Sequence, residues 1–123
     1  MKKILIVDDS ATAREIVVRV LGPGYDIVKA GDGVEALAKI AETSPDLVLL
    51  DLLMPVMDGF GVLENLAAAG SSIYVVVLSA DIQKSTRQRV LALGAVDLIN
   101  KPVNPDILRS LVRGLLDEKK GEP

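Results

Sequence analysis

The chain lacks both cysteine and histidine, and the two absences remove several kinds of chemistry. Without cysteine there are no disulfides, no thiolate metal sites and no thiol nucleophile. Without histidine, Ser-His hydrolysis, zinc sites of the usual kind and phosphoryl relay through an imidazole of this chain are excluded. Any acid, base or nucleophile must therefore be an Asp, Glu, Lys, Ser, Thr or Tyr side chain.

Long apolar runs and clusters of positive charge are also absent. The chain has 123 residues, of which 50% are hydrophobic and 25% charged, as in one globular domain with its own core. A net charge of −3 without a Lys/Arg cluster argues against direct binding of nucleic acid. The apolar runs are too short to span a bilayer, and the first residues lead into a predicted strand. We therefore expect a cytoplasmic protein without membrane insertion, one domain over residues 1–123 and a frayed tail over 118–123.

Short apolar runs alternate with helical patterns along the chain. Runs at residues 4–7, 47–50, 75–78 and 96–99 are rich in β-branched residues and leucine, which is typical of strands buried on both faces of a parallel sheet. A weaker strand is predicted at 26–30, and a helical pattern follows every strand. Repeated βα units of this size predict an α/β fold, a doubly wound five-stranded parallel sheet with helices on both faces.

Capping and turn residues set the limits of the predicted helices. Ser10 caps the first helix and Gly22-Pro23-Gly24 ends it, while Asn104-Pro105 begins the last. The other helices are predicted near 34–42, 60–69 and 84–93. Apolar faces are expected from Ala13, Ile16, Val17, Val20 and Leu21 in the first helix, from Val34, Leu37, Ile40 and Ala41 in the second, and from Ile107, Leu108, Leu111, Val112, Leu115 and Leu116 in the last.

Four of the predicted strands end on polar side chains of different kinds. Asp8-Asp9 follow the first strand, Asp51 the third, Ser79 the fourth and Lys101 the fifth. Because parallel strands end at the same edge of a sheet, these side chains should converge in one crevice. Open α/β sheets bind their ligands at that edge, so we expect the function to lie there.

The three carboxylates predict a magnesium site. Like charges in one crevice destabilise the fold unless a cation intervenes. Mg²⁺ suits them because it binds one or two carboxylates together with a carbonyl oxygen and waters. Asp8 or Asp9 alone is better explained as a helix cap or an Asx turn. With Asp51 on the neighbouring strand end, the metal site becomes the better interpretation.

The remaining crevice residues suit phosphoryl transfer. Asp51 cannot cap the next helix, which is predicted to begin only near residue 60, and a carboxylate beside Mg²⁺ is a plausible nucleophile towards phosphorus. The ammonium of Lys101 and the hydroxyl of Ser79 supply positioning and charge neutralisation. Taken singly, Lys101 is most simply a solvated lysine and Ser79 a strand-end cap. Pro102 restricts Lys101 to an extended conformation, which would fix its direction.

The motifs around these residues resemble the receiver domain of bacterial response regulators. The resemblance is carried by Ile4–Ser10, Asp51–Gly59, Leu78–Ala80 and Lys101-Pro102, and it covers essentially the whole chain. In architecture the chain is similar to single-domain chemotaxis regulators of the CheY type. The resemblance implies a flavodoxin-like sheet with strand order 2-1-3-4-5.

The resemblance also implies roles for individual residues. Asp51 would be the phosphoacceptor, attacking the phosphohistidine of a sensor histidine kinase. Ser79 and Lys101 would each hold a phosphoryl oxygen. The implied Mg²⁺ ligands are Asp8 (through water), Asp9, Asp51 and the backbone carbonyl of Leu53.

Output would occur by binding in trans to a downstream target protein or a phosphatase. The implied switch and output residues are Ala80, Asp81, Leu98 and Pro102. Many receivers place a Tyr or Phe at the position of Leu98, so the aromatic form of the switch is absent here.

Other functions use similar parts. A Mg²⁺-dependent phosphohydrolase with an aspartyl-phosphate intermediate would normally need an acid at the position of Leu53 and a cap domain. In a flavodoxin-like nucleotide binder, Asp8-Asp9 would repel a phosphate. A phosphorylation-independent interaction module leaves the acidic site unexplained. Labelling by an acyl phosphate that depends on Mg²⁺ and Asp51 would discriminate among them.

Overall fold

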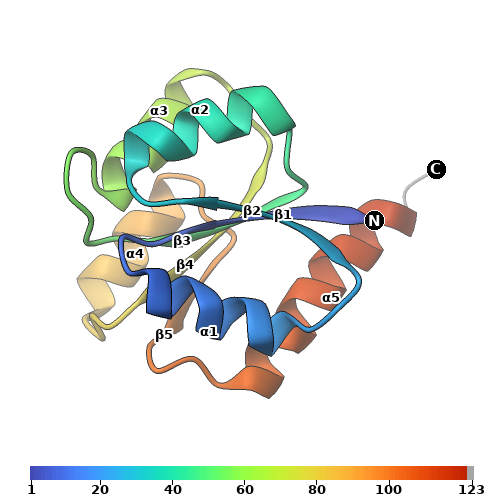
Figure 1. The fold of residues 1–123 in the computed structure, drawn as a ribbon. Helices are drawn as coiled ribbons and strands as arrows, with labels where there is room; N and C mark the ends of the chain where they lie inside the picture. The colour runs from blue at the N-terminus through green and yellow to red at the C-terminus, as the bar shows by residue number, and fades with distance from the viewer. Residues whose placement is uncertain (122–123) are drawn as a thin grey trace.

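A computed structural model describes residues 1–121 and shows one parallel sheet between two layers of helices (Figure 1). The strands are β1 (Lys2–Val7), β2 (Tyr25–Ala30), β3 (Leu47–Asp51), β4 (Tyr74–Ser79) and β5 (Asp97–Asn100). The helices are α1 (Ala11–Leu21), α2 (Gly33–Thr43), α3 (Gly59–Ala68), α4 (Lys84–Ala92) and α5 (Pro105–Gly121). The strand order is β2-β1-β3-β4-β5, which confirms the predicted doubly wound, flavodoxin-like fold.

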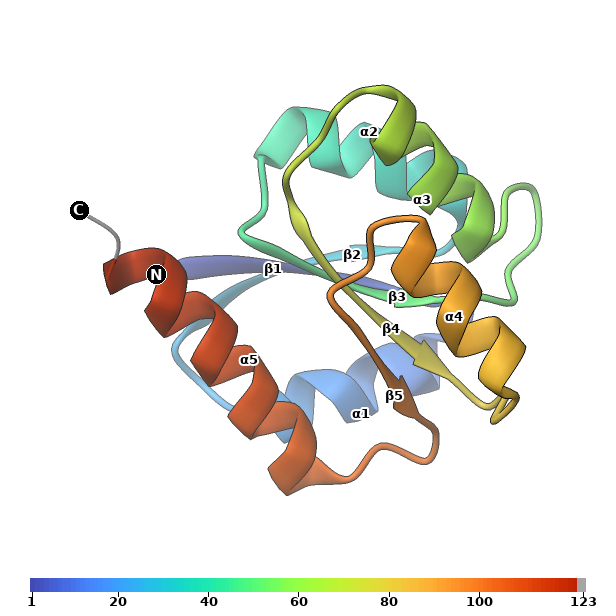
Figure 2. The same ribbon diagram turned by 180° about the vertical axis from the view of Figure 1, so that it is seen from behind.

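The central strands are buried on both faces because their apolar residues alternate between two clusters. In β1, Leu5 and Val7 pack towards α2, α3 and α4, whereas Ile4 and Ile6 pack towards α1 and α5. Figures 1 and 2 show the two helical layers from opposite sides. Each fully buried side chain of this kind contributes about 1.5–3 kcal/mol relative to exposure. The sheet is therefore the rigid element that positions the strand ends.

The predicted caps lie where the sequence places them. Ser10 Oγ accepts a hydrogen bond from the backbone N–H of Ala13 at 3.1 Å, and Gly22 ends α1 with a φ of 74°. The side chain of Asn104 accepts from the first backbone N–H groups of α5. Gly94, with a φ of 106°, follows the C-cap of α4.

Four residues of the predicted apolar faces are exposed instead of buried. Ile16 is 52% exposed, Val34 is 51% exposed and Ile107 is 56% exposed, and Ala41 is exposed as well. In α1 only Val17 and Leu21 are buried, one helical turn apart. A helical pattern predicts the centre of a contact stripe, but its width depends on how much of the helix the sheet covers.

The start of α2 also differs from the prediction. It begins at Gly33 rather than Val34, with the Asp32 side chain as its N-cap. Gly33 and Ala36 are its buried residues, because this helix lies directly against the chain at Met57. A Cβ on Gly33 would lie 2.6 Å from the carbonyl oxygen of Met57, so the contact admits only glycine.

Most of the tail expected over residues 118–123 belongs to α5, and residues 122 and 123 lie outside the described part of the chain. Fraying of this segment stays a prediction. Within residues 1–121, none of the helices combines the length and apolar character required to cross a bilayer.

Candidate functional site

Three carboxylates meet at the carboxyl end of the sheet. Asp8, Asp9 and Asp51 each bring one oxygen to within 4.8 Å of the others. Asp8 directly follows β1 and Asp51 is the last residue of β3; the two strands pair in register with Val7 opposite Leu50. The predicted convergence of these strand ends is confirmed.

Lys101 joins this cluster from beyond β5. Its backbone N–H bonds to the carbonyl of Ser79 at 2.8 Å, which continues the β4–β5 pairing past the last strand residue. Its Nζ lies 2.8 Å from Asp8 Oδ2 and 3.6 Å from Asp51 Oδ1. With only 26% of its side chain exposed, Lys101 is not a solvated surface lysine. Pro102 follows it and is exposed.

Asp8 is fully occupied by contacts, whereas Asp9 is not. Asp8 Oδ1 accepts from the backbone N–H of Ser10 at 3.0 Å, so the Asx turn predicted as its simpler role is present. Its other oxygen is held by Lys101, and its carbonyl accepts from Arg14 Nη1 at 2.6 Å. Asp9 is exposed, and its carboxylate has no partner within the part of the chain that the structure describes.

Burial and charge shift the pKa values of two residues in the site. Burial raises the pKa of Asp51; the charge of Lys101 opposes this and the charge of Asp8 adds to it. Burial alone would lower the pKa of Lys101, but the hydrogen bond with Asp8 and the charge of Asp51 outweigh it and raise the pKa. The ammonium is therefore held protonated beside a carboxylate that is costly to ionise.

Ser79 is buried at the end of β4, with 4% of its surface exposed. Its Oγ accepts a hydrogen bond from the backbone N–H of Asp81 at 3.0 Å, as in a strand-end cap. Within the described residues its hydroxyl donates to no acceptor, so its proton remains available.

The loop between β3 and α3 is shaped by close contacts at its base. A Cβ on Gly59 would lie 2.5 Å from the carbonyl oxygen of Asp51, so only glycine fits there. Asp58 caps α3 by accepting from the N–H of Gly61. At the tip, Leu53 is 79% exposed and Val56 is 82% exposed, the latter with a φ of 69°. The role of the Leu53 carbonyl as a metal ligand stays a prediction.

Asp81 organises the loop between β4 and α4. Its carboxylate accepts from the N–H of Gln83 at 2.9 Å and from Thr86 Oγ1 at 2.6 Å, and the hydrogen bond from Thr86 holds its pKa below the ordinary value. Its carbonyl accepts from the side chain of Asn100. Ala80 beside it is exposed. The loop thus links Ser79 to the first turn of α4.

Leu98 is buried in the core, and its carbonyl accepts from Arg87 Nη1 at 3.1 Å. Arg87 also pairs with Asp97 at 2.9 Å, so this arginine of α4 holds β5 through two residues. Neither Arg87 nor Arg14 was singled out from the sequence. The only signal for either was a basic residue on the helix that follows a strand end.

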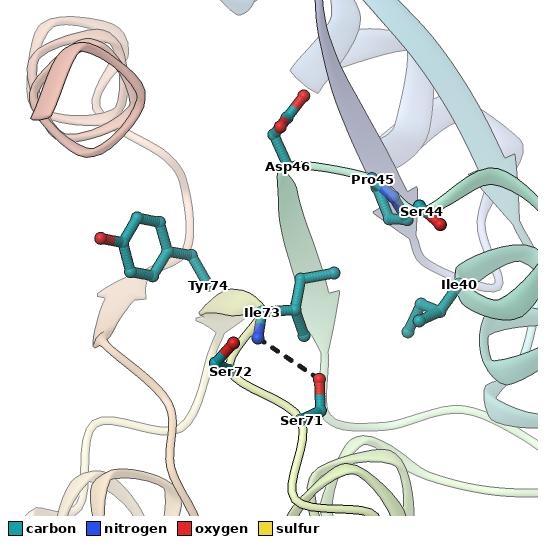
Figure 3. Close-up of a pocket in the computed structure, with 8 residues that line it drawn as sticks. All are labelled: Ile40, Ser44, Pro45, Asp46, Ser71, Ser72, Ile73 and Tyr74. Carbon is teal, nitrogen blue, oxygen red and sulfur yellow. Dashed lines mark hydrogen bonds between the residues drawn. The ribbon is translucent and has the colours of Figure 1, made fainter. Parts of the chain in front are cut away.

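A separate pocket, whose lining residues are drawn in Figure 3, lies at the opposite end of the strands from this cluster. It has a volume of about 610 Å³, is open to solvent and lies at the amino ends of β3 and β4. Its lining residues are Ile40, Ser44, Pro45, Asp46, Ser71, Ser72, Ile73 and Tyr74. None of the predicted site residues lines it. Asp8 and Lys101 instead border a smaller pocket of about 140 Å³ with Ala13, Ile16, Val17, Pro102 and Val103. The candidate site is therefore defined by its chemistry and not by its size.

Curated proteins with similar sequences and solved structures with the same fold are known for this chain. A probable transcriptional regulator, ycf27 of Porphyridium aerugineum, is 41% identical over 116 residues, which cover 94% of this chain and 48% of that protein. The chain spans about half or less of the length of the first curated relatives it matches. A CheY-like receiver domain protein from Methanospirillum hungatei has a TM-score of 0.86 and 30% identity, with 99% of each chain covered. The CheX-CheY-BeF3-Mg complex of Borrelia burgdorferi contains a chain with a TM-score of 0.88 and 29% identity, covering 94% of this chain and 89% of that one.

The model of the response regulator receiver domain family matches residues 4–113, which is most of the chain. Two-component systems use receiver domains as phosphoacceptor signalling modules rather than as conventional enzymes. The cluster of aspartates agrees with the acidic pocket at which such domains bind Mg²⁺. By its sequence, its strand order and its structural neighbours, this chain belongs to the receiver domains of two-component response regulators.

Proposed function

We propose that Asp51 accepts a phosphoryl group from the phosphohistidine of a sensor histidine kinase, in a reaction that requires Mg²⁺. One observation carries the proposal. The carboxylates of Asp8, Asp9 and Asp51 lie within 4.8 Å of one another, and the ammonium of Lys101 lies 3.6 Å from Asp51. A cluster of this composition suits an anionic, metal-dependent transfer better than any role in stabilising the fold.

The residues of the cluster fit magnesium. All three side chains offer carboxylate oxygens, which this hard cation prefers, and the Asp9 carboxylate is exposed and unpartnered in the described chain. Asp9, Asp51 and the Leu53 carbonyl would hold the ion directly. Asp8 would act through water, because both of its carboxylate oxygens already accept hydrogen bonds. When bound, the ion supplies charge neutralisation for the phosphoryl oxygens.

The protein's own groups then perform the transfer. One oxygen of Asp51 forms a bond to phosphorus while the P–N bond of the phosphohistidine breaks, and the imidazole nitrogen leaves with the bonding electrons. Lys101, which is held protonated, pairs with one phosphoryl oxygen in place of Asp51. The hydroxyl of Ser79 donates a hydrogen bond to another phosphoryl oxygen. Both groups stabilise charge without forming covalent bonds.

The proposal includes a cytoplasmic location and output by binding in trans, to a target protein or a phosphatase. The Borrelia neighbour, solved as a CheX-CheY complex with BeF3 and Mg, supports binding of this kind. A role of that output in chemotaxis is the more specific form of this proposal. A phosphohydrolase receives no specific support, because the exposed side chain two residues after Asp51 is Leu53, which cannot act as an acid.

Intact-mass measurement after incubation with acetyl phosphate and Mg²⁺ tests this function. The wild type should gain one phosphoryl group, whereas Asp51→Asn or addition of a chelator should prevent labelling. Asp117→Asn, which neutralises an exposed carboxylate outside the cluster, is the matched control and should label normally. Equal labelling of wild type and Asp51→Asn would contradict the assignment.

A further inference from the structure

Arg14 of α1 reaches back to the strand end that carries two of the carboxylates. Its Nη1 donates to the backbone carbonyl of Asp8 at 2.6 Å. Its Nε is buried and has no hydrogen-bond partner in the described chain. A buried N–H without a partner is rare and costs stability, so such a group needs an explanation. The side chain is held in this place by its contact with Asp8.

The contact fixes the peptide unit that joins Asp8 to Asp9. The carbonyl of Asp8 and the N–H of Asp9 belong to one planar group, so holding the carbonyl sets the direction in which Asp9 leaves the strand. Asp8 is also held by Ser10, Lys101 and its pairing with Ala30 at 3.1 Å. Among the described residues the Asp9 side chain makes no hydrogen bond or ion pair, so its position depends on that peptide unit.

We propose that Arg14 is a positioning residue for the magnesium site, because it orients the peptide unit that brings the Asp9 carboxylate beside those of Asp8 and Asp51. This inference rests on the proposed function. Residues that orient metal ligands without touching the metal typically change its affinity by about 10–100-fold when they are removed. Arg14 has the geometry of such a residue, because its Nη1 donates to the backbone carbonyl next to the ligand and not to the ligand itself.

A role through charge alone predicts the opposite effect. Arg14 is a cation near a cationic ligand, so removing only its charge should strengthen the binding of Mg²⁺. Removing its hydrogen bond should weaken binding, because the Asp9 carboxylate loses its fixed place. The sign of the change therefore separates positioning from electrostatics.

Calorimetric titration of Mg²⁺ into three variants provides the test. Arg14→Met removes both charge and donor and should weaken Mg²⁺ binding about tenfold or more. Arg14→Lys keeps a donor of nearly the same reach and should bind Mg²⁺ at least half as tightly as wild type, whereas a loss as large as that of Arg14→Met would count against a role through this hydrogen bond. Arg19→Met, on an exposed part of the same helix, is the matched control and should leave the affinity unchanged. Circular dichroism verifies that each variant is folded.

A double-mutant cycle with Asp9→Asn then tests whether Arg14 affects Mg²⁺ binding through Asp9. In the Asp9→Asn background, Arg14→Met should change Mg²⁺ affinity less than about twofold, because the ligand that it positions is already lost. Melting temperatures over a wide Mg²⁺ range report these weak affinities. Binding by Arg14→Met as tight as wild type or tighter, or a full loss that persists without Asp9, would overturn the inference. Absence of Mg²⁺ binding in the wild type would instead overturn the proposed function and this inference with it.

Discussion

Val56 offers a stabilising substitution next to the proposed phosphorylation site. Its φ of 69° is in the left-handed region, where a β-branched side chain costs about 1–2 kcal/mol. Asparagine adopts this conformation readily, so Val56→Asn should relieve most of this conformational energy. Because Val56 is 82% exposed, the substitution gives up less than about 0.6 kcal/mol of apolar burial. The expected net gain is about 1 kcal/mol, or about 4 °C in melting temperature.

Urea unfolding of the metal-free protein measures this gain. Val96→Asn is the matched control, because Val96 is also partly exposed, at 40%, but has no positive φ to relieve. The control should be neutral or destabilising while Val56→Asn stabilises. A loss of stability in Val56→Asn, or equal effects in both variants, would refute the reasoning about strain.

Four further outcomes follow from the site. Because burial raises the pKa of Asp51, the folded state binds a proton there more tightly than the unfolded chain and loses stability as the pH rises through the shifted range. Asp51→Asn should therefore raise the urea midpoint at about pH 7 and have little effect below the ordinary aspartate pKa of about 3.9; the same gain at both pH values would contradict this. Asp9→Asn should raise the melting temperature of the metal-free protein, because it removes one of three carboxylate charges that lie within 4.8 Å of one another, and it should abolish the further rise that Mg²⁺ produces; a clear loss of metal-free stability would contradict this. Leu53→Asn should shorten the phosphoryl lifetime, measured by loss of label, because leucine cannot orient an attacking water; identical lifetimes would count against that role. Beryllofluoride should shift the amide signals of residues 80–89 more than that of Leu98, and the reverse pattern in NMR spectra would exclude this route for the signal.

The fold and the carboxylate cluster could be predicted because both follow from periodic patterns. Buried parallel strands are continuous apolar runs, and a polar residue that ends such a run must lie at the edge of the sheet. Asp51 and Lys101 were therefore placed together from their positions alone. The distance of 3.6 Å between Lys101 Nζ and Asp51 Oδ1 confirms that the two side chains meet.

The contacts of Arg14 and Arg87 could not be predicted in the same way. Each is a long flexible side chain that reaches from a helix to a backbone carbonyl, 6 and 11 positions away in the chain. No periodicity fixes the direction of such a side chain, since the target is a carbonyl that every residue has. The exposure of Ile16 could not be predicted for a related reason, because the sequence does not show how much of the surface of a helix contacts the sheet.

The attachment of α4 has a consequence for local unfolding. Val90 is its only buried residue, whereas α3 buries four. Much of what holds α4 is polar: Arg87 bonds to β5, and Arg89 lies 3.8 Å from the centre of the Phe60 ring. Water and salt can replace such contacts, but they cannot replace apolar burial. The amide hydrogens of α4 should therefore exchange with solvent well before those of the sheet, and faster as the ionic strength rises. Added salt should therefore promote local unfolding of α4, while the strands that carry the aspartates remain protected from exchange.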